Sequence, residues 1–293
     1  MRDADDEVFK SWSESAAFWD KHRDARQAMF STITDALSRE AAIPHPRQCG
    51  PFTILDVAAG AGDVSFQIAE RHDANITIWC TDLVSAMVRA AKRCAERSGV
   101  RNMRFSECRG EELPFESGTF DAVVCRFGIM FFSEPVAGIR ESLRVLKPGA
   151  RAAFAVWGPR ETNPFLGAVQ NVADRYAPSP PPDPEAPGAY RFAERGKLLD
   201  LMREAGAHDP VERVAGLHFE FELSFDRFFE ARTEMSDTLR EKVRRMPPEL
   251  LSRFKEDVRA ETQPYFHSNR FRFPAEILIV SGAAPMVPAP RCE

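Results

Sequence analysis

The sequence contains few cysteines, and they are not arranged to bind a metal or to build a disulfide framework. There are 6 among 293 residues, with no CxxC pair and no Cys/His cluster. Several lie in apolar segments, where a free thiol behaves as a small hydrophobic group. The six are Cys49, Cys80, Cys94, Cys108, Cys125 and Cys292. Neither a zinc site nor a set of disulfides is therefore expected.

Long hydrophobic runs are also missing. No apolar stretch approaches the roughly 20 residues that a membrane-spanning helix needs. The first ten residues, MRDADDEVFK, are acidic and lack the apolar centre of a signal peptide. We therefore expect no integral membrane segment and a cytoplasmic location.

Charge of one sign is not concentrated anywhere along the chain. The formal net charge is -5, and no block of Lys and Arg is dense enough to follow a phosphate backbone. Nucleic acid is therefore not an expected partner, a small molecule is the default ligand, and a homodimer is compatible with the composition. With 44% hydrophobic residues, the chain can bury the core of one large domain or of one domain with a cap.

From residue 52 to residue 158, short apolar runs alternate with helical stretches. This pattern is typical of β-α-β units, in which helices cover both faces of a mainly parallel sheet. We therefore expect a Rossmann-like α/β core at residues 48–158. Before it, apolar residues spaced near 3.6 within residues 7–42 predict one or two amphipathic helices that Pro44 and Pro46 end. This N-terminal segment, residues 1–47, is expected to cover the site.

After Gly158 the alternation stops. The proline-rich residues 178–188 predict a surface loop. A helix that begins at residue 194 and ends at Gly206, a strand over 211–223, two or three helices over 225–262 and a last strand over 271–283 follow from the pattern. We expect residues 159–262 to form a helical cap with one sheet strand, and residues 263–293 to form an antiparallel last strand and a tail.

The stretch ILDVAAGAGDVSFQIAE, residues 54–70, changes from a strand to a helix through five small residues. Such a turn lets a ligand approach the main chain closely. A dinucleotide fold would have glycine at position 65, where this chain has Ser65, and Asp63 would place a negative charge beside a pyrophosphate. S-adenosylmethionine, a nucleoside without phosphate, tolerates both features better.

Asp82 ends the second predicted strand, where a carboxylate can accept hydrogen bonds from both ribose hydroxyls. Both ligand classes contain a ribose, so Asp82 does not choose between them. A nicotinamide-dependent oxidoreductase therefore stays an alternative, although no Tyr/Lys or His pattern for hydride transfer is present. A methyltransferase-fold protein that binds a ligand without catalysis is the other alternative.

Four ordered blocks make residues 54–158 resemble class I S-adenosylmethionine-dependent methyltransferases, in particular the ubiquinone/menaquinone-biosynthesis-like group. The blocks are LDVAAGAGD at 55–63, TDLVSAMVRAA at 81–91, EELPFESGTFDAVVCRFGIMFF at 111–132 and ESLRVLKPGARAAFAVW at 141–157. The resemblance implies a Rossmann-like methyltransferase fold, S-adenosylmethionine as cofactor, and O- or C-methylation of a small, hydrophobic or aromatic acceptor. LKPG at 146–149 would be the turn before the fifth strand.

Residue by residue, the resemblance implies contacts to three parts of the cofactor. Contacts to its methionine end come from the glycine turn: Asp56, Ala58, Gly60 and Gly62. Contacts to its nucleoside come from the next two strand ends: Asp82 at the ribose, Leu83 and Met87 beside the adenine, and Gly110 and Glu111 along the adenine edge. Contacts to its sulfonium and to the acceptor follow the fourth strand: Arg126 and Phe127.

The chain departs from the family pattern at two positions. The first motif glycine is Ala58, which we expect at a negative φ, and Arg109 stands where the family often has an adenine-accepting Asp or Asn. Because arginine cannot accept a hydrogen bond, Arg109 is not included among the predicted site residues.

No general base is evident from the sequence. His22 and His267 are the candidates, and a surface helix position explains His22 as well. Trp19 could cover the methionine tail of the cofactor or simply pack in the core. The many phenylalanines could line an acceptor pocket or form the core, and the Arg/Glu-rich stretch 232–261 is expected to be a solvated helical face.

Overall fold

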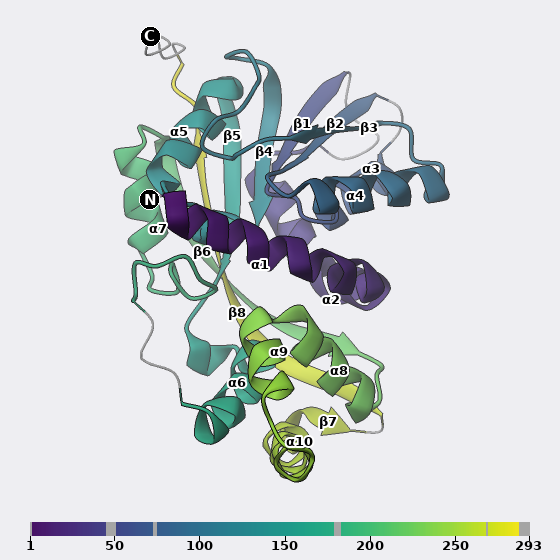
Figure 1. Ribbon diagram of the computed structural model, residues 1–293. Coiled ribbons are helices and arrows are strands. Elements are labelled where there is room, and N and C mark those ends of the chain that lie inside the picture. The colour runs from purple at the N-terminus through teal and green to yellow at the C-terminus, as the bar shows by residue number, and fades with distance from the viewer. Residues whose placement is uncertain (1, 45–50, 73–74, 179–182, 268, 287–293) are drawn as a thin grey trace.

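The computed structural model describes residues 2–44, 51–72, 75–178, 183–267 and 269–286 (Figure 1). Eight strands form one sheet: β1 (Phe52–Val57), β2 (Ile76–Asp82), β3 (Met103–Glu107), β4 (Phe120–Arg126), β5 (Leu146–Trp157), β6 (His208–Phe221), β7 (Phe266–His267) and β8 (Arg270–Ala283). The helices before β6 are α1 (Arg2–Lys21), α2 (Arg23–Glu40), α3 (Asp63–Arg71), α4 (Ser85–Ser98), α5 (Pro135–Val145), α6 (Pro164–Tyr176) and α7 (Lys197–Glu204). Those after it are α8 (Phe225–Met235), α9 (Asp237–Arg244) and α10 (Pro248–Thr262).

The sheet has the order β3-β2-β1-β4-β5-β8-β6. The strands from β3 to β5 are parallel, whereas β8 runs antiparallel to both β5 and β6. Strands such as β1 and β4 are apolar on both sides because helices cover both faces. The predicted Rossmann-like fold with an antiparallel last strand is confirmed.

Helices α2 and α7 pack on opposite faces of this sheet. In β8, Ser281 Oγ donates to Glu40 at the end of α2, whereas a side chain at Gly282 would meet Met202 of α7. Successive residues of a strand point to opposite faces. Helix α2 lies against α3, and α5 packs with α7.

The last two long strands continue beyond the rest of the sheet. From Phe271 to Glu276, β8 pairs with β6 and no longer with β5. Helices α6, α8, α9 and α10 surround this two-stranded extension and form the lower lobe in Figure 1. Four of the helices within the expected cap, residues 159–262, form this lobe. Helix α7 and strand β6, from the same range, pack with the sheet and helices of the core instead.

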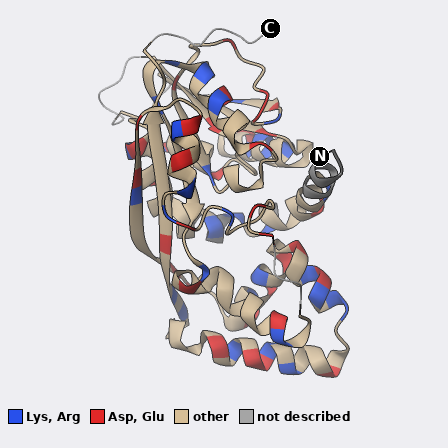
Figure 2. Cartoon of the chain, turned by 90° about the vertical axis from the view of Figure 1, so that its left-hand side faces the viewer, with Lys and Arg blue, Asp and Glu red and all other residues tan. Residues whose placement is uncertain are grey.

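Three local expectations need correction or lie outside the described part of the chain. LKPG is not a separate turn, because β5 begins at Leu146 and the residues after it form an irregularity in the pairing with β4. The stretch 232–261 is mostly solvated, and charged residues of both signs are interspersed along α10 in Figure 2. Arg232, however, is buried at 6% exposure. His45, Pro46, Cys49 and Cys292 lie outside the described residues.

Within the described ranges, no helix is long and apolar enough to cross a bilayer. The four described cysteines, Cys80, Cys94, Cys108 and Cys125, are free thiols. The same part of the chain contains no group of three or more metal-ligating side chains.

Candidate functional site

A pocket lies where β1, β2 and β4 end, beneath the N-terminal helices α1 and α2. Including the part open to solvent, it holds about 1120 Å³ of empty space. Its walls combine the predicted glycine turn with carboxylates, three arginines and a group of aromatic side chains. The carboxyl ends of parallel strands are the usual ligand site of such sheets.

The turn after β1 is built around the carboxylate of Asp82. Oδ2 of Asp82 accepts from the N–H of Gly60 at 2.8 Å, and Oδ1 accepts from the N–H of Val84 at 2.9 Å. Gly60 has a φ of 57° and no atom near the place of a side chain, so it keeps the turn bare. Burial raises the pKa of Asp82 to about 6, although both N–H groups favour the charged form.

Gly62 has a different role from the one implied by the resemblance. Its φ is 82°, and a Cβ there would come within 2.9 Å of Ala91 Cβ on α4. Gly62 is not among the pocket-lining residues. It lets α3 begin close to α4, and therefore acts by packing.

Ala58 lines the pocket in a left-handed backbone conformation, with a φ of 52°. The expected negative φ is wrong. Strand β1 ends at Val57, and the chain turns at Ala58 while Ala59 N–H still donates to the carbonyl of Thr81 on β2. An L-residue with a Cβ pays about 1–2 kcal/mol for this conformation.

We predict that Ala58→Gly raises the free energy of unfolding by about 0.5–1 kcal/mol, because relief of left-handed strain exceeds the entropic cost of glycine. Urea denaturation measures this change. Ala59→Gly is the matched control, since Ala59 has no positive φ, and should destabilise. A loss of stability in Ala58→Gly would contradict the prediction.

Asp56 is fully buried at the end of β1 and lines the pocket. Its Oδ2 accepts from the N–H of Ser65 at 3.0 Å and from Ser65 Oγ at 2.7 Å, whereas its buried Oδ1 has no partner. Burial raises the pKa of Asp56 to about 7 despite these two hydrogen bonds. The pocket therefore contains an acceptor that a cationic ligand could satisfy.

A buried ion pair that the sequence reasoning missed closes the pocket beside α3. Arg26 of α2 binds Asp63 through Nε at 2.5 Å and Nη2 at 2.9 Å, and Arg126 Nη2 lies 3.4 Å from the same carboxylate. Burial alone would raise the pKa of Asp63, but the two arginines hold it below its ordinary value. Asp63 is therefore ionised, and the two arginines compensate its charge. The argument that this charge repels a pyrophosphate no longer holds.

Aromatic side chains of α1 cover the other side of the pocket. Trp12 packs edge-on against Trp19 and Phe131, with ring centroids 5.4 Å and 5.1 Å apart. Trp19 lines the pocket, as considered from the sequence, and its Nε1 is buried without a partner. Arg26 lies over the Trp19 ring at 4.6 Å and donates to its carbonyl.

Phe127 follows β4 with a φ of 62°, unusual for a bulky residue. Its ring stacks on Trp157 with centroids 4.3 Å apart, and Phe30 meets it edge-on at 5.6 Å. Arg126 donates to Thr34 Oγ1 at 2.8 Å. Both predicted residues, Arg126 and Phe127, line the pocket.

The residues predicted beside the nucleoside also line the pocket: Leu83, Met87, Gly110 and Glu111. Glu111 Oε1 accepts from the N–H of Ser133 at 3.0 Å and lies 3.6 Å from Arg109 Nη2. Arg109 lines the pocket too, although it was not included among the predicted site residues.

Neither candidate general base lies in this pocket. His22 Nε2 is 2.8 Å from Glu234 of α8, and His267 is exposed on β7, where its Nε2 is 3.1 Å from the carbonyl of Pro264. No histidine lines the pocket among the described residues.

Comparison with known proteins now agrees with the geometry. The model of the ubiE/COQ5 methyltransferase family matches residues 21–166, which include α2, the turn, β1 to β5 and every pocket carboxylate named above. By sequence and fold, the core is that of a class I methyltransferase, and residues 21–166 are similar to the ubiE/COQ5 family. The matched segment ends near the start of α6, and the lower lobe lies beyond it.

Among curated proteins, the ubiquinone/menaquinone biosynthesis C-methyltransferase UbiE of Idiomarina loihiensis is 30% identical over 125 residues. The match covers 42% of this chain and 48% of that protein. UbiE of Agrobacterium fabrum is 35% identical over 131 residues, with 44% and 46% covered. The chain thus spans about half the length of the curated relatives it matches.

Among solved structures, the YcgJ protein from Bacillus subtilis has a TM-score of 0.54 at 17% identity, over 88% of this chain and 98% of that chain. The two chains thus share their fold.

Proposed function

We propose that the chain binds S-adenosylmethionine in the pocket above the glycine turn and transfers its methyl group to a small, apolar acceptor. The observation that carries this proposal is the position of three features at one sheet edge: the bare turn at Gly60, Asp82 at the end of β2, and the unpartnered Oδ1 of Asp56.

The residues of the pocket fit the chemical groups of this cofactor. Asp82 has lone pairs left for ribose hydroxyls after it has accepted from Gly60 and Val84. The orphaned Oδ1 of Asp56 suits a ligand that carries positive charge. Met87 and Leu83 offer an apolar wall to a flat base.

S-adenosylmethionine supplies an activated methyl group, so the protein has mainly to align the acceptor and to exclude water. Trp12, Trp19, Phe131 and Phe127 form a largely apolar enclosure for this purpose. Because no histidine of the described residues lines the pocket, the proposal favours an acceptor atom that is acidic enough to react without a strong base.

Asp82→Ala is predicted to weaken S-adenosylmethionine binding by about 1–3 kcal/mol, because charge-assisted hydrogen bonds to the ribose are lost. Calorimetric titration of the full chain measures this effect. Glu107→Ala is the control: Glu107 pairs with Asp82 in the sheet register but is exposed and lies outside the pocket. Unchanged affinity in Asp82→Ala would contradict the ribose assignment.

The same titration tests the alternative of a nicotinamide-dependent oxidoreductase. Ser65 occupies the position where dinucleotide folds have glycine, and here both its N–H and its hydroxyl hold Asp56. A nicotinamide dinucleotide should therefore bind weakly or not at all, and tight binding of it in place of S-adenosylmethionine would refute the proposal. Lys and Arg are interspersed with Asp and Glu along the cartoon in Figure 2, which supports a small-molecule acceptor over a nucleic acid.

A further inference from the structure

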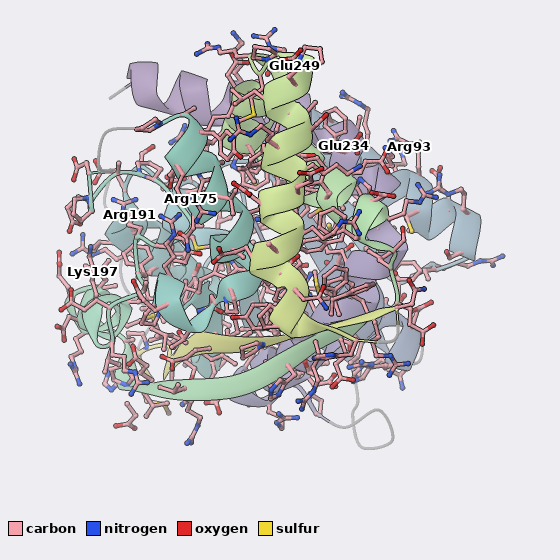
Figure 3. The ribbon with its side chains drawn as sticks, turned by 90° about the horizontal axis from the view of Figure 1, so that it is seen from below. Arg93, Arg175, Arg191, Lys197, Glu234 and Glu249 are labelled. Atoms are coloured by element: carbon pink, nitrogen blue, oxygen red, sulfur yellow. The ribbon has the colours of Figure 1, made fainter. Side chains whose placement is uncertain are left out.

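A second pocket lies between α2 and the lower lobe, and Arg26 lines both pockets. It is lined by Met29 of α2, Phe165 of α6, Phe221 of β6 and Phe228 and Met235 of α8, together with the side chains of Arg26 and Arg232. Its empty space is about 360 Å³, a figure that includes the part open to solvent. Figure 3 views this lobe from below, with α10 in front and Glu234 on α8 beside it.

The two arginines in this pocket differ in their partners. Arg26 is already bound to Asp63 in the first pocket. Arg232 is only 6% exposed, and its Nε has no hydrogen-bond partner. The one hydrogen bond of its side chain is long, 3.5 Å from Nη2 to the carbonyl of Leu166. Its guanidinium lies 4.8 Å from the centre of the Phe165 ring.

The acidic residues around Arg232 are engaged elsewhere. Glu230 binds Lys21, and Glu234 binds both Lys21 and His22 at the rim of the pocket. The phenol of Tyr190, which interacts electrostatically with Arg232, has no hydrogen-bond partner, and burial raises its pKa to about 12, so it is neutral near pH 7. Within the described part of the chain, Arg232 therefore has no counterion.

An uncompensated buried charge costs free energy, and such groups are normally paired. We propose that the second pocket binds an anionic amphiphile, in which an apolar body lies among the phenylalanine and methionine side chains and a carboxylate is held by Arg232. This site is separate from the proposed cofactor pocket, with Arg26 in the wall between the two.

Octanoate and 1-octanol are suitable probes, because they share an apolar chain and differ in the charge of the head group. Calorimetric titration of the full chain should show saturable octanoate binding at least tenfold tighter than octanol binding. Arg232→Met should abolish this preference without lowering the melting temperature, because it removes an unpaired buried charge.

Arg227→Met is the matched control, since Arg227 lies on the same helix and is exposed, with 68% of its side chain accessible. This variant should keep the full preference for octanoate. Ala231→Glu is a second test that leaves every arginine in place: it adds a competing carboxylate at the pocket wall and should also remove octanoate binding.

The proposal is overturned if wild-type protein shows no saturable octanoate binding or binds octanol equally well. It is also overturned if Arg232→Met keeps the preference or, should that variant not fold, if Ala231→Glu keeps it. Binding of S-adenosylmethionine is measured separately, so failure of either site leaves the other result readable.

Discussion

Replacing Asp63 by asparagine is expected to lower the free energy of unfolding by about 3–5 kcal/mol, because it leaves two buried guanidinium groups without their shared counterion. Arg26 makes two hydrogen bonds to Asp63, and Arg126 lies within 3.4 Å of it. Arg26→Met should cost less, since Arg126 still faces the carboxylate. The double variant should recover part of the loss, which a double-mutant cycle in urea measures.

The same two helices provide the control. Asp35 of α2 and Arg71 of α3 also form an ion pair, but both side chains are exposed, at 41% and 43%. Asp35→Asn should change stability by no more than about 1 kcal/mol. Equal losses of unfolding free energy for Asp35→Asn and Asp63→Asn would show that the buried ion pair contributes no more to stability than the exposed one.

Binding of S-adenosylmethionine is expected to weaken by roughly 100-fold between pH 8 and pH 5, because Asp56 must lose its proton to accept a cationic ligand. Its pKa of about 7 in the unliganded protein places this transition near neutrality. Asp82, with a pKa of about 6, adds a smaller dependence at the acidic end. Calorimetry at a series of pH values measures the slope.

Asp56→Asn tests the assignment, because its affinity should vary little between pH 6 and pH 8. Stability of the unliganded protein should change in the opposite direction. The folded carboxyl group keeps its proton up to about pH 7, whereas the unfolded one releases it near 3.8, so this contribution to stability falls as pH rises through that window. An affinity for S-adenosylmethionine that is independent of pH in wild type would exclude ionised Asp56 from the site.

The local parts of the site could be predicted from the sequence, and the long-range parts could not. Gly60 and Asp82 follow strands whose apolar runs are easy to recognise, and parallel strands bring their ends to one edge. Arg26 and Asp63 are 37 residues apart, and no local pattern pairs them. A signal was present, however: Arg26 lies in the helical series with Phe30, Ile33 and Leu37, all buried.

Arg232 carries a similar signal, since it follows Phe225, Phe228 and Phe229 on the buried side of α8. Composition alone placed it on a solvated face, because most arginines and glutamates of that stretch are solvated. The expected negative φ of Ala58 was wrong for another reason. The backbone conformation of a turn residue is imposed by the surrounding structure, which the identity of the residue does not reveal.

The place of β8 in the sheet has a consequence for the order of assembly. This strand comes after β6 in the chain, yet it lies between β5 and β6. A growing polypeptide can therefore pair its first five strands early, but β6 has no strand to pair with until β8 has been synthesised. Until then the phenylalanines of β6 and α8 lack part of their packing surface. The lower lobe is therefore the part of the molecule most exposed to aggregation during synthesis.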